Sequence, residues 1–128
     1  MNYVHIVVLL AIIQFIFFGV MVGKARARYG VNAPAMTGNE HFERAVRVQM
    51  NTLEQLVCFV PAVLIASMYW PQLYVAAAGA VYLVGRIIYW RAYVSDPSKR
   101  AVGFLLTVAP TLLLIAAGLM GAFTRSGA

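Results

Sequence analysis

The sequence predicts an all-α membrane protein, a bundle of four transmembrane helices, from its composition and from three long uncharged tracts. Of the 128 residues, 62% are hydrophobic and only 11% are charged. This leaves too few polar side chains to cover a soluble domain of this size, and it excludes a disordered chain, because disorder requires low hydrophobicity. The uncharged tracts lie at 4–23, 55–85 and 101–124. Each is long enough to cross a hydrocarbon core of roughly 30 Å.

The middle tract is predicted to form two helices. It holds 31 uncharged residues between Glu54 and Arg86, more than one crossing needs, and Trp70-Pro71-Gln72 interrupts it at a proline. At a rise of about 1.5 Å per residue, neither half is long enough to cross the membrane alone. Each helix must therefore include polar residues at the end away from the proline. Glu54 and Arg86 are then predicted at similar depth, where an ion pair between them is one outcome. The predicted spans of this single domain, residues 1–128, are about 4–23, 49–69, 73–93 and 101–123.

The basic residues predict the orientation. The chain has 10 basic and 4 acidic side chains, a net charge of +6, and no Lys or Arg precedes the first tract. A cleavable signal peptide carries its positive charge there, so we expect a retained helix with its N-terminus outside. The cations flank apolar tracts, which favours membrane topology over nucleic-acid binding. Eight cations on one side predict that this side faces the cytoplasm, and the compact chain suggests a bacterial inner membrane. They are Lys24, Arg26, Arg28, Arg44, Arg47, Arg91, Lys99 and Arg100.

Two polar stripes lie on neighbouring predicted helices. The first, on the second helix at spacings of four, four and three, consists of Glu43, Arg47, Asn51 and Glu54. The second, on the third helix at spacings of three and four, consists of Arg86, Tyr89 and Tyr93. Each alone is also typical of polar contacts between helices or of a membrane-interface belt. Together, at one membrane level, they are typical of a pocket for a small zwitterionic or anionic ligand that opens to the cytoplasm.

These stripes carry a resemblance to a known family. The relevant runs are Phe42-Glu43-Arg44-x-x-Arg47-x-Gln49-x-Asn51-Thr52-x-Glu54, then Arg86-x-x-Tyr89-x-x-x-Tyr93, then Arg100. Their order resembles the signature of the MAPEG family, the membrane-associated proteins in eicosanoid and glutathione metabolism, across all four predicted spans. The resemblance implies a homotrimer of four-helix protomers in contact with membrane lipids. It also implies glutathione as co-substrate at a protomer interface near the cytoplasmic face, and a lipophilic small-molecule substrate that arrives from the bilayer.

The resemblance implies a role for each matching position. The positions that match glutathione-binding residues are Arg47, Asn51, Glu54, Tyr89 and Tyr93, with Gln49 in a supporting position and Arg26 where a basic residue contributes from the adjacent protomer. Arg100 matches the arginine that stabilises the glutathione thiolate and is the expected catalytic residue. This role has a physical basis. A thiol with a pKa of about 8.5 is mostly protonated at neutral pH, and a neighbouring guanidinium favours the nucleophilic thiolate.

The expected function is therefore an integral membrane glutathione transferase, with glutathione peroxidase activity as an open alternative. Gln55 stands where the leukotriene-synthase branch has a tyrosine, so the acceptor could be either an electrophilic xenobiotic or a lipid hydroperoxide.

Cys58, the only cysteine, is expected to be a small buried hydrophobe, and no metal site is expected around His5 or His41. Two other readings are a non-catalytic lipid-binding protein of the same fold and a small multidrug transporter. The presence of Arg100 argues against a non-catalytic lipid-binding protein. The absence of Asp and Glu from the first predicted span argues against a small multidrug transporter.

Overall fold

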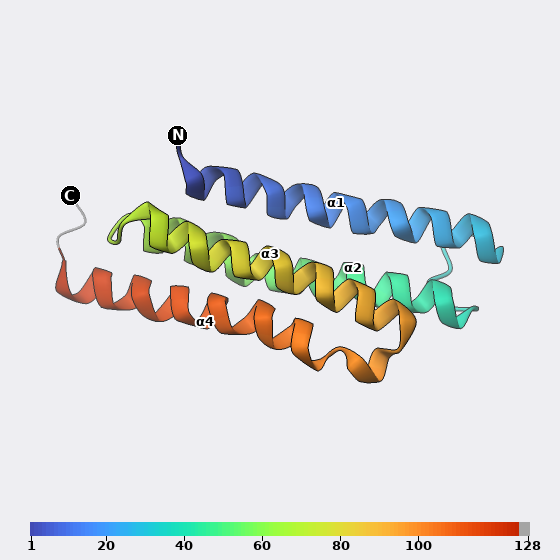
Figure 1. Cartoon of the computed structure of the whole chain (residues 1–128). Helices are drawn as coiled ribbons and strands as arrows, with labels where there is room; N and C mark the ends of the chain where they lie inside the picture. Colours follow the sequence, from blue (N-terminus) through green and yellow to red (C-terminus); the bar gives the residue numbers. More distant parts are fainter. Residues whose placement is uncertain (126–128) are drawn as a thin grey trace.

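The computed structural model describes residues 1–125 as four long helices that run up and down in one bundle (Figure 1). The helices are α1 (Tyr3–Tyr29), α2 (Glu40–Ser67), α3 (Gln72–Ser95) and α4 (Ala101–Thr124), with a short 3-10 helix η1 (Pro97–Lys99) before α4. Each of the four is long and apolar enough to cross a membrane, so the predicted fold class is confirmed. The α1–α2 and α3–α4 connections share one end of the bundle, called the loop end below, and the α2–α3 turn lies at the other (Figure 1).

Local chemistry sets the helix ends. The Asn2 side chain accepts the His5 N–H and so caps the start of α1, and Gly30 closes α1 in the left-handed region at φ 67°. Asn39 caps α2 in the same way, and Pro71 separates α2 from α3 at the predicted break. α2 begins at Glu40, well before the predicted start of its span near 49. Membrane thickness gives only a minimum helix length, whereas the Asn39 cap gives the actual start.

Glycines let α3 and α4 approach closely. A Cβ on Gly85 would lie 2.7 Å from the backbone carbon of Leu106, and one on Gly103 would lie 2.8 Å from the Cβ of Tyr89. Neither position has room for a larger side chain without a shift of the neighbouring helix. Gly79 is likewise buried and lies against Val7 of α1. This close contact holds the start of α4 against the loop-end half of α3.

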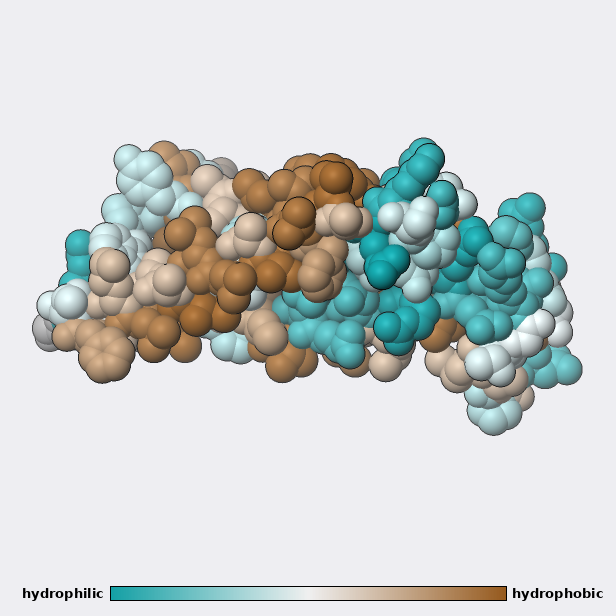
Figure 2. Space-filling view, turned by 90° about the horizontal axis from the view of Figure 1, so that it is seen from below, coloured by the Kyte–Doolittle hydropathy of each residue, from teal (hydrophilic) through white to brown (hydrophobic). Residues whose placement is uncertain are grey.

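Polar and apolar surfaces are separated along the bundle axis. Figure 2 shows polar residues gathered at the loop end and a broad apolar surface over the rest of the visible face. Large apolar side chains such as Leu9 and Leu105 are 60% and 63% exposed, as expected of helices that face lipid. Cys58 is exposed, so the expectation that it is buried was wrong. One apolar run cannot distinguish a face that packs on protein from one that faces lipid. The side-chain amide of Gln14 donates to the Leu83 carbonyl oxygen at 3.0 Å and so links α1 to α3.

Candidate functional site

A groove at the loop end brings together residues from α2, α3, η1 and α4. Its volume is about 640 Å³, within the usual range for small-molecule sites. The lining residues are Arg47, Asn51, Tyr89, Tyr93, Ser98, Arg100, Ala101 and Phe104. Five of the eight site residues predicted from the sequence are in this set, and they come from two helices and a loop that are distant in the sequence.

Helical spacing explains how the side chains converge. Arg47 and Asn51 are four residues apart on α2, and Tyr89 and Tyr93 are four apart on α3, so each pair shares one face of its helix. The two tyrosine rings lie 5.5 Å apart between centroids. Arg100 is exposed at the start of α4, where one guanidinium nitrogen donates to the Pro97 carbonyl oxygen at 2.9 Å. Its other N–H groups make no hydrogen bond within residues 1–125.

A buried arginine orients one wall of the groove. Arg86 is fully buried and donates through Nε to Thr107 Oγ1 at 2.9 Å. Its Nη1 donates to Asn51 Oδ1 at 2.9 Å and to Thr52 Oγ1 at 3.1 Å. Because Asn51 Oδ1 accepts from Arg86, the amide nitrogen of Asn51 is the group left to donate to a ligand. The Arg86 guanidinium carbon also lies 4.4 Å from the centroid of the Tyr89 ring, so one cation supports two lining residues.

The predicted outcome of a Glu54–Arg86 ion pair was wrong. Arg86 is surrounded by neutral oxygens, and Glu54 is exposed on α2. Within the part of the chain that the structure describes, the ion pair present joins Arg44 and Glu40 one helical turn apart. Equal distance from the α2–α3 turn determines the depth of two residues but not the direction in which each side chain points. Neutral oxygens on α2 and α4 accept the hydrogen bonds of the Arg86 guanidinium instead.

Three predicted site residues lie outside the groove. Arg26 donates to the Ala35 carbonyl oxygen at 2.8 Å, and its guanidinium carbon lies 4.8 Å from the centroid of the Phe42 ring. It therefore connects α1 to the α1–α2 connection of its own protomer. Gln49 is half-buried and packs against α1 at Gly19. Glu54 is exposed, as described above.

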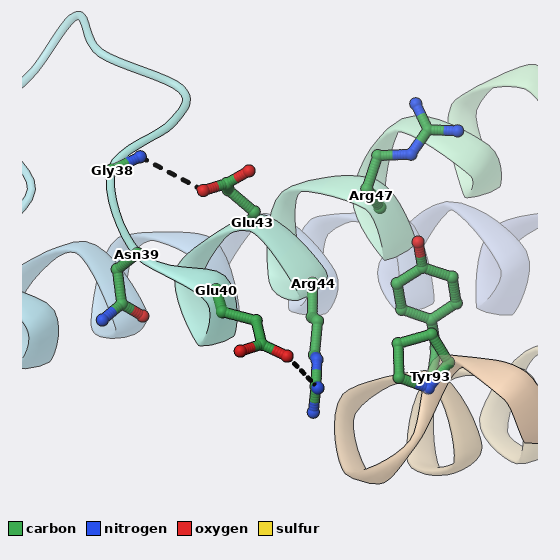
Figure 3. A pocket seen from close by; sticks show the side chains of 8 residues that line it. Gly38, Asn39, Glu40, Glu43, Arg44, Arg47 and Tyr93 are labelled. Carbon is green, nitrogen blue, oxygen red and sulfur yellow. Dashed lines mark hydrogen bonds and ion pairs between the residues drawn. The ribbon is translucent and has the colours of Figure 1, made fainter.

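A second hollow adjoins the groove at Arg47 and Tyr93. Its volume is about 440 Å³, and it lies between the start of α2 and the end of α3 (Figure 3). Its polar groups are largely paired with one another. Glu43 accepts the Gly38 backbone N–H at 3.2 Å, and Arg44 donates to the Val94 carbonyl oxygen at 3.1 Å and pairs with Glu40. Arg47, in contrast, makes no hydrogen bond or ion pair within residues 1–125.

The charge of the groove favours anions. Its lining residues include the two guanidiniums of Arg47 and Arg100 and no carboxylate, so a carboxylate or thiolate is the complementary ligand group. Asp96 is not among the lining residues, and its carboxylate accepts hydrogen bonds from the hydroxyl and backbone N–H of Ser98 at 2.8 and 3.1 Å. These two hydrogen bonds hold the pKa of the Asp96 carboxyl below its usual range.

Sequence reasoning missed several residues of the site, although signals for them existed. Phe104 follows Arg100 by four residues, a spacing that places both on one helix face. Ser98 follows Asp96 by two residues, a spacing typical of an Asx turn. Thr52 and Thr107 could have been proposed as partners because a buried guanidinium requires acceptors at its own depth.

Comparison with known proteins identifies the family. The model of the MAPEG family matches residues 4–120, nearly the whole chain. The chain belongs to the MAPEG family. This MAPEG chain is 44% identical to an uncharacterised protein of Synechocystis, over 87% of the chain and 81% of that protein. It is 37% identical to human microsomal glutathione S-transferase 2, over 82% of the chain and 71% of that protein.

A further relative of this MAPEG protein is bovine leukotriene C4 synthase, at 29% identity over 90% of the chain and 77% of that protein. The resemblance inferred from the polar stripes is thereby confirmed. Four helices of membrane-spanning length in a MAPEG chain make it an integral multi-pass membrane protein.

Proposed function

We propose that this MAPEG protein is a membrane glutathione transferase that binds glutathione in the loop-end groove. The observation that carries the proposal is the convergence of Arg47, Asn51, Tyr89, Tyr93 and Arg100 on one groove of about 640 Å³. Relatives named microsomal glutathione S-transferase 2 support it, with identities of 34–37% in three mammals.

The groove matches the chemistry of glutathione. At neutral pH the tripeptide carries two carboxylates, one ammonium and a thiol. The unpaired Arg47 guanidinium binds a carboxylate, and the Asn51 amide nitrogen and the tyrosine hydroxyls hold backbone groups of the peptide. A charge-assisted hydrogen bond, such as that from Arg47 to a carboxylate, contributes about 1.5–3 kcal/mol.

Arg100 is the proposed catalytic residue. Its exposed guanidinium lies beside the site and stabilises the thiolate of bound glutathione over the thiol. Each unit by which the thiol pKa falls corresponds to about 1.4 kcal/mol. The thiolate sulfur then forms a bond to the electrophilic carbon of the acceptor, and the displaced leaving group departs with the electron pair of the broken bond. The acceptor is a lipophilic molecule that reaches the groove from the bilayer.

Hydroperoxides are a second class of acceptor for the same thiolate. Two glutathione molecules would then be oxidised to the disulfide while the hydroperoxide is reduced to an alcohol and water. The same groove and the same Arg100 serve both reactions, so only the acceptor distinguishes transferase from peroxidase activity.

We propose further that the protein is a homotrimer whose neighbouring protomer completes each site. Glu54 is an exposed carboxylate on a membrane-spanning helix, a costly arrangement in lipid that a protomer packed on this face would relieve. Arg26 and Gln49, which lie outside the groove of their own protomer, would be supplied to the groove of the next. The positive-inside rule supports a groove at the cytoplasmic face, and we expect a bacterial inner membrane as the host.

The proposal is tested by calorimetric titration of glutathione into detergent-purified protein. The wild type is expected to bind, and Arg47→Ala is expected to lose affinity by at least about tenfold, the loss of one charge-assisted hydrogen bond. Arg91→Ala is the matched control, because Arg91 is an exposed arginine of α3 outside the groove. No binding by the wild type, or equal losses in both variants, would contradict the proposal. Product analysis with chlorodinitrobenzene and with a fatty-acid hydroperoxide then distinguishes the acceptors.

A further inference from the structure

Two hollows, both separate from the glutathione groove, meet at Trp90: one lies between α1 and α3, and the other also borders the start of α2. The deeper one lies among membrane-spanning residues and has a volume of about 510 Å³. Its apolar wall includes Leu10, Ile13, Phe17, Leu83 and Ile87. The other lies toward the loop end, has a volume of about 280 Å³ and is lined by Lys24, Arg28 and His41 around an apolar floor. Trp90 lines both hollows, so they adjoin at this residue, and together they are called the lipid groove below.

The cations of the lipid groove are free to bind a ligand. Lys24 and Arg28 are exposed and four residues apart, so they lie on one face of α1. Neither makes a hydrogen bond or ion pair within residues 1–125. The positive-inside rule accounts for cations near this end of α1 but not for the direction in which they point. Arg26, two residues from each, donates instead to the Ala35 carbonyl oxygen at 2.8 Å.

The length of the lipid groove fits an acyl chain. Leu10 and Lys24 are fourteen residues apart on α1, or about 21 Å along the helix. One leaflet of a hydrocarbon core of roughly 30 Å is about 15 Å thick. The lipid groove, measured from its cationic end at Lys24, is therefore at least as long as one leaflet is thick. Trp90 is placed where the two parts meet, and aromatic rings of this kind favour the boundary between headgroups and chains.

We propose that the lipid groove binds an anionic glycerophospholipid from the leaflet at the loop end. The phosphate lies between Lys24 and Arg28, and one acyl chain runs along α1 and α3 past Trp90. Charge complementarity selects an anionic headgroup over a zwitterionic one, and the apolar part selects a lipid over a soluble phosphate. The proposal uses none of the residues assigned to glutathione and does not depend on the proposed function.

Quenching of Trp90 fluorescence by brominated acyl chains tests this site. The full chain carries a Trp70→Phe substitution, so that Trp90 is its only tryptophan, and is reconstituted into vesicles. Phosphatidylglycerol and phosphatidylcholine with identical brominated chains are each titrated against an unbrominated phosphatidylcholine background. We expect relative affinity for phosphatidylglycerol to exceed that for phosphatidylcholine by about fivefold for each engaged cation.

Matched variants make the outcome specific. In the Trp70→Phe background, Lys24→Ala is expected to reduce the preference about fivefold, and Lys24→Ala with Arg28→Ala is expected to abolish it. Lys99→Ala, which removes the same charge from an exposed residue outside the lipid groove, is expected to leave it unchanged. Equal quenching by both lipids, or equal effects of Lys24→Ala and Lys99→Ala, would overturn the proposal. Displacement of the brominated lipid by inorganic phosphate would also overturn it, because the ligand would then be soluble phosphate.

Discussion

Arg86 shows how one buried residue shapes a site that it does not line. Its guanidinium bonds to oxygens on α2 and α4 and lies against the ring of Tyr89. Through these contacts it orients the Asn51 amide and supports one tyrosine of the groove. A buried cation of this kind is stable only while its acceptors remain in place. Arg86 is therefore a positioning residue, and its effect should appear first in stability and then in glutathione affinity.

Arg86→Leu is expected to destabilise the bundle by about 2–3 kcal/mol, because three oxygens lose a charged donor and two of them, on Thr52 and Thr107, remain buried. Arg91→Leu, on the exposed side of α3, should change stability by less than about 0.5 kcal/mol. Thermal unfolding in detergent measures both. Equal stability of the two variants would show that the Arg86 contacts do not hold the helices together.

The Asp96–Ser98 contact predicts a pH dependence at the edge of the groove. The pKa of Asp96 is below its usual range in the folded chain because Ser98 donates two hydrogen bonds to it. Its contribution to the stability of the loop is therefore fully present above the usual carboxyl pKa of about 3.9 and is lost as the pH falls through the lowered value. Ser98→Ala should raise the pKa of Asp96 toward its usual value. Ser95→Ala should not, because that hydroxyl bonds to Arg91 and Ala92. Carbon NMR of the Asp96 carboxyl follows the titration, and an unchanged pKa in Ser98→Ala would contradict this account.

Residue spacing predicted much of the site but not the direction of every side chain. The four-residue spacings correctly placed Arg47 with Asn51 and Tyr89 with Tyr93. They did not predict that Glu54 lies outside the groove of its own protomer, because position along a helix gives the depth and direction of a side chain but not the neighbour that it meets. The same limit explains why exposed Cys58 was expected to be buried. In a membrane helix both faces are apolar, so hydrophobicity does not report burial.

At the element scale, helix breaks were predictable and helix starts were less so. Pro71 marked the α2–α3 turn correctly, because a proline lacks the N–H that continues a helix. The start of α2 after the long α1–α2 connection was harder to predict. The thickness of the membrane sets a minimum length for a helix, but it does not determine how many charged turns precede the membrane-spanning part. The capping pattern at Asn39 was the available signal. The close contact of α3 with α4 depended on glycines whose neighbours no single sequence reveals.

Gly103→Ala should force α4 away from α3, because the added Cβ would meet the backbone of Tyr89. We expect a loss of about 1–3 kcal/mol in stability and weaker glutathione binding, since Tyr89 lines the groove. Gly23→Ala is the control: it lies within α1 with nothing near its added Cβ. There alanine should be neutral or stabilise by about 0.5–1 kcal/mol. Similar unfolding temperatures for the two variants would contradict the close-packing account.

At the scale of the whole molecule, the bundle combines an apolar surface for lipid with a polar end for a charged ligand (Figure 2). In the proposed function, glutathione would approach the groove from the aqueous phase and the lipophilic acceptor from the bilayer. The bundle also leaves Glu54, Arg26 and Gln49 outside the groove of their own protomer. In the proposed homotrimer these three residues act at the interface between protomers.

Complementation tests this assembly. Arg26→Ala and Arg47→Ala homotrimers should each conjugate glutathione poorly. Co-expressed chains should regain activity, because a site with Arg47 from one protomer and Arg26 from its neighbour is intact in roughly a quarter of random assortments. Mass measurement of the native complex should give three protomers. Failure to regain activity in a mixed trimer would show that Arg26 does not act across the interface.

The most direct measurement of the central claim is the pKa of the glutathione thiol bound to detergent-purified protein, followed by thiolate ultraviolet absorbance. The wild type is expected to lower this pKa below the free value of about 8.5. Arg100→Ala should bind glutathione without lowering it, while Lys99→Ala, the adjacent cation outside the groove, should behave as the wild type. Binding without any lowering in the wild type would contradict the transferase account and indicate a non-catalytic binder. The same lowering in Arg100→Ala as in the wild type would show that another group activates the thiol.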